Sequence, residues 1–136
     1  MPVLGVFKQF RNAPRLFSQG DYEEIKRWYL GHGETPPDEG WLPRHGRIVP
    51  EVAAGFLYTT DSKIGFLDAF IGNPGARARE VKQAIEEILI ALAEDAKQAG
   101  LTVVFGNTKH ASIAEIAKTL GGVAGAEKYF VLAKVL

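Results

Sequence analysis

Residues 65–118 follow the order strand, turn, helix, strand, helix, and this order limits the fold more than any other feature of the chain. The apolar run at 66–71 favours a strand that ends at Gly72-Asn73-Pro74, a sequence typical of a turn. Over 81–100, apolar residues recur every three or four positions and a glycine closes the pattern, as in a helix with a left-handed cap. Because a helical crossover joins parallel strands, the short apolar run 102–105 is expected to lie parallel to the first strand.

The other segments predict an antiparallel meander bordered by helices. Asp21 is a candidate N-cap for a helix that ends near Gly31, with Glu24 as the return partner of a capping box. Residues 31–40 contain two prolines and three glycines, so they predict a long loop. The remaining expected elements are a strand or irregular arm in 3–10, strands in 47–49, 52–60 and 129–135, and a second helix capped by Thr108 or Ser112 and ended by Gly121 and Gly122.

Composition indicates a single globular domain over residues 1–136. Hydrophobic residues make up 46% of the chain and charged residues 24%, which supports a real core and excludes a disordered chain. The 16 basic and 16 acidic residues balance, so no net field attracts nucleic acid or an anionic membrane. With no cysteine and no apolar window long enough for a membrane span, we expect a cytoplasmic protein. His32 and His45 lack a third ligand at metal spacing, so no metal site is expected.

The end of the first strand and the basic turn after it resemble the GNAT superfamily of N-acetyltransferases. In that family, a strand ending in an apolar-x-Pro turn precedes a phosphate-binding loop of pattern Arg/Gln-x-x-Gly-x-Gly, and a helix follows. Here residues 71–74 look like the strand end and Arg77 matches the leading Arg, whereas Glu80 and Lys82 occupy the two glycine positions. The likeness covers most of residues 41–136, and it is strongest to the small family members often carried by phages and prophages.

The resemblance implies an α/β fold of the GNAT type, a three-layer sandwich. Its mixed, mostly antiparallel sheet would be splayed next to Pro74, with helices on both faces. It also implies acetyl-CoA as the acyl donor, with the pyrophosphate held at the start of a helix and the thioester carbonyl polarised by the splayed strand. The residues expected to bind this cofactor are Phe70, Ile71, Gly72, Arg77, Ala78, Arg79, Glu80, Val81 and Lys82. In the alternative interpretation, residues 77–82 are only a solvated first helical turn.

The departures from the family pattern affect both the cofactor loop and the second helix. Side chains in place of glycines hinder a close approach of the backbone to phosphate, and Glu80 adds a negative charge there. The family's second helix usually carries a tyrosine that serves as a candidate general acid near the thioester sulfur, and Ala117 stands at that position. His110 is a candidate replacement for this catalytic acid, or else a polar residue that caps the helix.

Asp68 is the candidate catalytic base, because the family often keeps a glutamate near this place on the strand. A carboxylate beside Leu67, Ala69 and Phe70 would be partly desolvated, which raises its pKa toward that of a base. In the alternative interpretation, Asp68 is a surface charge on the solvent side of the strand, opposite Leu67 and Ala69.

Two functions remain open at this stage. The first is an acyl-CoA-dependent N-acyltransferase in which a small-molecule or peptide amine attacks the thioester directly. The second is a catalytically silent GNAT-fold protein for binding or assembly, motivated by Glu80, Lys82 and Ala117. Trp41 either lines the acceptor pocket or anchors the core. An exposed last strand at 129–135 would allow pairing with a second copy, and hence a homodimer.

Overall fold

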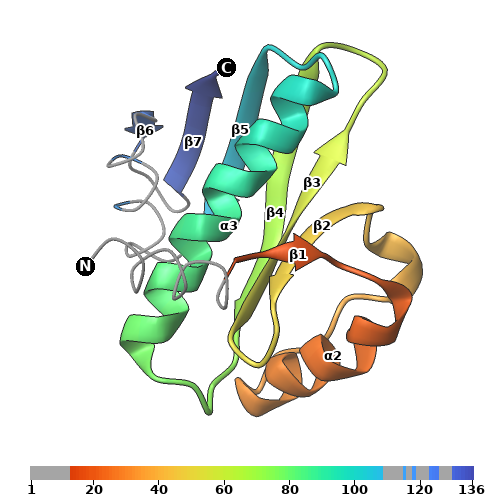
Figure 1. The fold of residues 1–136 in the computed structure, drawn as a ribbon, viewed down its shortest axis with the longest axis vertical. Coiled ribbons are helices and arrows are strands. Elements are labelled where there is room, and N and C mark those ends of the chain that lie inside the picture. Colours follow the sequence, from red (N-terminus) through yellow and green to blue (C-terminus); the bar gives the residue numbers. More distant parts are fainter. Residues whose placement is uncertain (1–12, 109–114, 116–117, 119–122, 126–129) are drawn as a thin grey trace.

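A computed structural model of the chain describes residues 13–108, 115, 118, 123–125 and 130–136 (Figure 1). The elements in chain order are β1 (Arg15–Leu16), the 3-10 helix η1 (Gln19–Asp21), α2 (Tyr22–Gly31), the 3-10 helix η2 (Glu39–Trp41), β2 (His45–Val49), β3 (Ala53–Thr59), β4 (Ile64–Gly72), α3 (Ala78–Gln98), β5 (Val103–Thr108), β6 (Val123–Gly125) and β7 (Phe130–Val135). The strand or arm expected in 3–10 and most of the expected second helix lie outside the described residues.

The strands of the described residues form one seven-stranded sheet in the order β1-β2-β3-β4-β5-β7-β6. Strands β4 and β5 run parallel because α3 joins them as a crossover. Every other neighbouring pair is antiparallel, including the meander of β2, β3 and β4. The mixed, mostly antiparallel sheet expected from the sequence is therefore confirmed.

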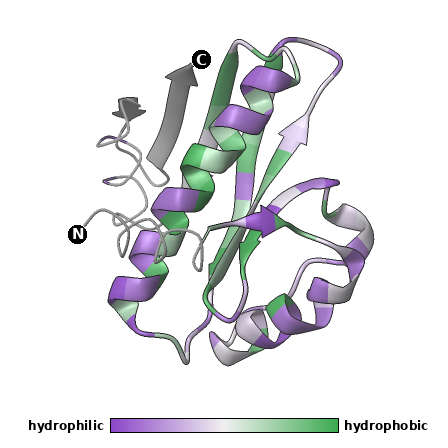
Figure 2. Cartoon of the chain, in the orientation of Figure 1, coloured by the Kyte–Doolittle hydropathy of each residue, from purple (hydrophilic) through white to green (hydrophobic). Residues whose placement is uncertain are grey.

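Hydrophobic clusters cover both faces of the sheet. Ala53 and Ala54 are adjacent on β3 but belong to different clusters, since side chains alternate along a strand. On one face α3 packs Ile88 and Leu92, both fully buried, and on the other face α2 packs the fully buried Ile25. Figure 2 shows largely hydrophobic central strands and bands of hydrophilic residues along α3. Helices thus cover both faces of the sheet, and the three-layer sandwich is confirmed.

The start of α2 differs from the capping box expected at Asp21 and Glu24. Asp21 Oδ2 accepts the Ser18 N–H at 2.8 Å, and Arg15 donates to both carboxylate oxygens at 2.8 and 2.9 Å. The Arg15 guanidinium holds the pKa of the Asp21 carboxyl below its ordinary value. Glu24 Oε1 instead accepts the Glu51 N–H at 2.8 Å, in the turn between β2 and β3. The capping box is wrong because both carboxylates find partners on other elements.

Helix α3 ends as expected but begins earlier. Gly100 follows it with a φ of +84°, and its N–H donates to the Lys97 carbonyl at 3.0 Å. The helix begins at Ala78 rather than near Val81, so Arg79 belongs to the helix and not to the turn. Within the described residues, no helix is long and apolar enough to cross a membrane.

Strand β7 lies inside the sheet rather than at its edge. It pairs with β5 along its whole length, and on its other side β6 pairs with Val131, Leu132 and Ala133. The expectation of an exposed last strand is therefore wrong over these three residues. The free edge on which the homodimer hypothesis depended is occupied there by β6.

Candidate active site

A β-bulge on β4 puts two consecutive side chains on the face covered by α2. Ala54 pairs with Ile71 and Phe56 pairs with Asp68, so β4 has one more residue than β3 between these pairs. Ala69 is the residue with irregular backbone, at a φ of +57° in the left-handed region. It packs with the α2 cluster, and Asp68 shares that face because it is paired with Phe56. The expected alternation, which set Asp68 opposite Ala69, is therefore wrong.

Strands β4 and β5 separate directly before this bulge. Their parallel pairing ends at Leu67 and Gly106. From there β4 continues to Gly72 beside β3, while β5 continues to Thr108 beside β7. The last part of β4 thus has no paired strand on its β5 side within the described part of the chain. The splay expected next to Pro74 is present.

Hydrogen bonds of Asn73 fix the turn that follows β4. Its N–H donates to the Val52 carbonyl and its side-chain amide donates to the Glu51 carbonyl, each at 2.8 Å. Asn73 Oδ1 accepts the Gly75 N–H at 2.8 Å, which closes a tight turn before α3. The turn between β2 and β3 therefore positions the turn that leads into α3.

The end of α2 contacts the same turn. His32 Nε2 lies 2.8 Å from the Gly72 carbonyl oxygen. Gly31 allows Pro74 to approach closely, since a Cβ at Gly31 would lie 2.7 Å from Pro74 Cγ. The α2 helix, the end of β4 and the start of α3 thus meet at one place.

Three backbone N–H groups at the start of α3 have no partner inside the helix. Arg77 is the N-cap with an extended backbone, and its side chain makes no capping bond. The Val81 N–H donates to the Arg77 carbonyl at 3.0 Å. The N–H groups of Ala78, Arg79 and Glu80 lie before this first helical bond, where they and the helix dipole favour an anion. The Val81 N–H is thus bonded within the helix, and the place of Val81 among the cofactor-binding residues stays a prediction.

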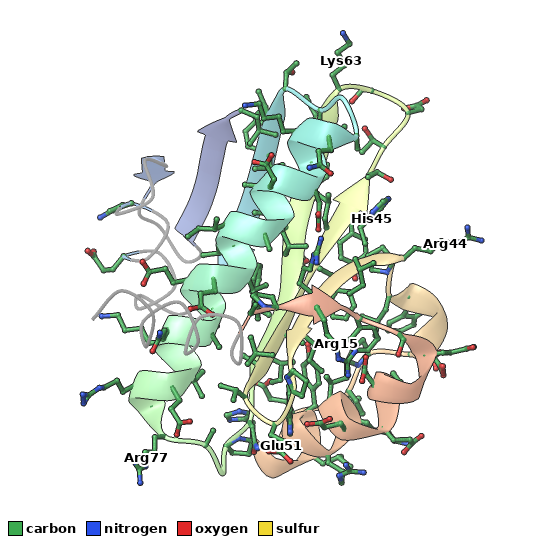
Figure 3. The ribbon with its side chains drawn as sticks, viewed as in Figure 1. Arg15, Arg44, His45, Glu51, Lys63 and Arg77 are labelled. Carbon is green, nitrogen blue, oxygen red and sulfur yellow. The ribbon has the colours of Figure 1, made fainter. Side chains whose placement is uncertain are left out.

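The side chains around this helix end are mostly exposed. Arg77, Arg79 and Lys82 are exposed, and Figure 3 shows Arg77 extending away from the start of α3. Glu80 is exposed as well, and with Gln83 it lines a small cavity between α3 and the turn joining β2 to β3. Residues 78–82 therefore form a first helical turn, as the alternative interpretation held. Their role in phosphate binding stays a prediction.

The expected cofactor residues at the end of β4 divide between the two faces. Phe70 packs with the α3 cluster, and Ile71 is buried in the α2 cluster. Gly72 abuts α3, where a Cβ would lie 2.6 Å from Val81 Cγ1. The side chains of Phe70 and Ile71 therefore serve the core, and what this strand end offers a ligand is its backbone.

Asp68 lies near two tyrosines that the sequence did not assign to a site. Tyr29 of α2 and Tyr58 of β3 both pack with the α2 cluster. Burial, and after it the charge of Asp68, raises the pKa of the Tyr29 phenol to about 12. The same two causes raise the pKa of Tyr58. Asp68 itself is exposed, and its Oδ1 accepts the Ala69 N–H at 2.7 Å. The expected partial desolvation of this carboxylate is therefore wrong.

Comparison with known proteins identifies the fold. No family model and no curated protein matches the sequence. Among solved structures, N-acetylglutamate synthase from Neisseria gonorrhoeae with coenzyme A and L-arginine matches with a TM-score of 0.70 and 14% identity over 91% of this chain and 33% of that chain. The chain has the GNAT fold. The protein yncA from Salmonella typhimurium, with its cofactor acetyl-CoA, matches with a TM-score of 0.69 and 13% identity, over 91% of this chain and 93% of that chain. Ribosomal-protein-alanine N-acetyltransferase from Brucella melitensis matches with a TM-score of 0.68 and 11% identity, over 90% of this chain and 99% of that chain.

The chain thus spans about a third of the Neisseria synthase and nearly all of the other two GNAT-type structures. Trp41 is 69% exposed in this GNAT fold, so its alternative role as a core anchor is wrong. His110 and Ala117 lie outside the described residues. The phage-type origin stays a prediction.

The two tyrosines missed by sequence analysis differ in how they could have been found. Tyr58 is paired with Phe66, two residues along β4 from Asp68, so the register of the expected meander would have placed it on the same face. Tyr29 reaches the site only because α2 docks on that face. No local pattern in the sequence indicates this docking.

Proposed function

We propose that this GNAT-fold chain is an acyl-CoA-dependent N-acyltransferase that transfers an acetyl group to an amine by direct attack. The observation that carries the proposal is that the splay of β4 and β5 coincides with the bulge at Asp68 and Ala69. A strand without a partner offers backbone groups to an extended ligand. The Neisseria synthase and yncA, which were solved with coenzyme A and acetyl-CoA, support this choice of cofactor.

The start of α3 fits the phosphate groups of acetyl-CoA. Three N–H groups point out of the helix end, and two exposed guanidinium groups, those of Arg77 and Arg79, stand beside them. Guanidinium groups pair well with phosphate oxygens. The negative charge of Glu80 opposes an anion, but its side chain lines the small cavity toward the β2–β3 turn. When bound, acetyl-CoA would supply an activated thioester as the acyl donor, with its sulfur as the leaving group, which would take its proton from solvent.

In this mechanism Asp68 takes the proton of the attacking amine. The carboxylate is exposed on the α2 face, and the Ala69 N–H holds one of its oxygens. A base in this position acts by hydrogen-bond reach, either directly or through one water. The backbone N–H groups of β4 beyond the bulge are proposed to polarise the thioester carbonyl. Asp68 passes its proton on to solvent.

Calorimetric titration of acetyl-CoA into the purified protein tests this function. We expect saturable binding with a micromolar dissociation constant, about −8 kcal/mol. Changing both Arg77 and Arg79 to alanine should abolish it, because it removes two phosphate partners. The control is Arg44→Ala with Lys63→Ala, which removes the same charge, and Figure 3 shows these residues away from Arg77. This control should bind acetyl-CoA as the unchanged protein does.

Two results would overturn the proposal. The first is the absence of heat from the unchanged protein, together with a melting temperature that millimolar acetyl-CoA does not raise. The second is an equal loss of binding in the control, which would mean that Arg77 and Arg79 act only through the net charge of the protein. The first result would favour the catalytically silent binding protein instead.

A further inference from the structure

The face of the sheet around Asp68 carries a row of aromatic rings. Tyr58 is paired with Phe66 across β3 and β4, and Phe66 is paired with Phe105 across β4 and β5. Paired residues of neighbouring strands share a face, so the three rings and Asp68 lie on the same side. The ring centroids of Phe66 and Phe105 are 6.1 Å apart, and Phe66 is 43% exposed. The row therefore presents aromatic surface that a ligand can contact.

The charges that act on this face are negative. The phenol of Tyr29 is influenced by Asp68, Glu34 and Tyr58, and that of Tyr58 by Asp68. After burial, the charge of Asp68 is the largest cause that raises the pKa of each phenol. Figure 3 shows Arg44, which directly precedes β2, extending away from the molecule. Such a site attracts a cation and repels a carboxylate.

The charge and the rings share a face by ordinary strand alternation, and the bulge adds Ala69 to that face. Without it, Asp68 and Ala69 would face opposite sides of the sheet, and only one of them would share the face of Phe66. With it, small Ala69 follows Asp68 on the same face, beside a carboxylate that lies two residues along β4 from Phe66. The splay begins at this point, so a ligand on the rings would have its polar end at the place of the proposed acyl transfer.

We propose that the acceptor is a primary amine on an aromatic body that carries no carboxylate. This inference depends on the proposed acyltransferase function, since it places the amine nitrogen beside Asp68. The rings of Phe66 and Phe105 would stack on the body, and Tyr58 would face the ammonium group, an arrangement that attracts cations. The ammonium gives up its first proton before attack and its second to Asp68 during it. Solvent receives both, and the departing sulfur takes one proton back.

Phenethylamine and L-phenylalanine are the probes that isolate the carboxylate, because they differ only in that group. The first experiment measures the binding of each to the free protein by calorimetry, without cofactor. The second measures kcat/KM for each at saturating acetyl-CoA, with n-butylamine as the amine without a ring. We expect the affinity and kcat/KM for phenethylamine to exceed those for L-phenylalanine at least about tenfold, because the carboxylate of L-phenylalanine is repelled by like charge. The kcat/KM for phenethylamine should also exceed that for n-butylamine.

Variants separate the carboxylate from the rings. Asp68→Asn should reduce the ratio of phenethylamine to L-phenylalanine binding, because it removes the charge that discriminates between them. Phe66→Ala should weaken the binding of phenethylamine about fivefold or more and leave kcat/KM for n-butylamine unchanged. The control Ile90→Ala truncates an apolar residue, 53% exposed, on α3, which covers the other face of the sheet. This control should change neither the binding of phenethylamine nor kcat/KM for n-butylamine.

Each failure has a separate meaning. If acetyl-CoA binds but L-phenylalanine binds or reacts as well as phenethylamine, the inference is overturned and the acyltransferase function stands. The inference is also overturned if Asp68→Asn leaves the ratio of the two ligands unchanged. If acetyl-CoA does not bind, the proposed function fails, and binding of the two amines to the free protein still decides what this face recognises.

Discussion

Replacing Gly72 with alanine should force the end of β4 and the start of α3 apart. A Cβ at this position would lie 2.6 Å from Val81 Cγ1, roughly 1 Å inside an ordinary contact between carbon atoms. Valine has one strongly preferred rotamer in a helix, so its methyl group cannot turn away and the helix itself must shift. Gly72 has no positive φ, so the strain comes from this contact alone.

The size of the effect follows from overpacking. Adding a methyl group to a tight contact costs about 1–3 kcal/mol of unfolding free energy. For a domain of this size, each kcal/mol lowers the melting temperature by about 3–5 °C. Val81→Ala alone should cost about 1–2 kcal/mol through the lost methyl groups. In the double variant the new Cβ takes up the vacated space, so its destabilisation should be smaller than the sum of the two single changes by about 1–2 kcal/mol.

Urea denaturation followed by circular dichroism measures all four proteins of this cycle. The control is Gly40→Ala, because a Cβ at Gly40 meets no atom within 4 Å and the residue has no positive φ. Acetyl-CoA titration of the same proteins tests whether displacing α3 weakens the phosphate site. Additivity of the two single changes within about 0.5 kcal/mol would refute the reasoning, because the contact would then not be rigid.

Three further predictions concern Asp21, Ala69 and Asp68. Asp21→Asn should lower the free energy of unfolding most at pH values above the ordinary Asp pKa of 3.8. Because Arg15 stabilises only the charged carboxylate, the difference should vanish as pH falls through the lower pKa that Asp21 has in the folded protein. Urea denaturation at a series of pH values measures this difference. Ala69→Val should cost about 1–3 kcal/mol by the same method, because β-branched residues strain at a φ of +57°. Asp68→Asn should lower the pKa of Tyr29 from about 12, as ultraviolet titration of the phenolate measures.

Matched variants define what would contradict these predictions. A constant difference between Asp21→Asn and the unchanged protein down to the lowest pH would mean that the carboxylate charge plays no part. Ala69→Gly relieves the backbone strain, so a glycine variant less stable than the valine variant would contradict the assigned φ effect. Glu34→Gln removes a weaker influence on Tyr29, so it should shift the phenol less than Asp68→Asn does.

Local sequence patterns were sufficient to predict the main elements, although not the short strands β1 and β6. The apolar period of α3, its closing Gly100 and the turn at Gly72-Asn73-Pro74 depend on interactions within a few residues, so they could be located without the fold. The parallel pairing of β4 and β5 also followed from the sequence, because a helical crossover permits no other arrangement.

Partner choice was where sequence reasoning failed. Asp21 and Glu24 have the spacing of a capping box, yet Arg15 and the Glu51 N–H are better partners that only the fold supplies. The first turn of α3 shows the same limit. Arg79 looked like part of a turn, but the helix extends back to Ala78, soon after the turn that Asn73 holds.

The sequence by itself determined the order of the main strands and helices, because periodicity and turn chemistry are local, and its resemblance to the GNAT superfamily pointed to Asp68 as the candidate base. The tertiary structure decided which groups surround that carboxylate. The extra residue of the bulge reverses the side-chain alternation, and a change of one residue moves a side chain to the other face. Alternation along β4 is enough to put Phe66 on the face of Asp68, whereas only the bulge could add Ala69 to that face and only the docking of α2 could bring Tyr29 to it.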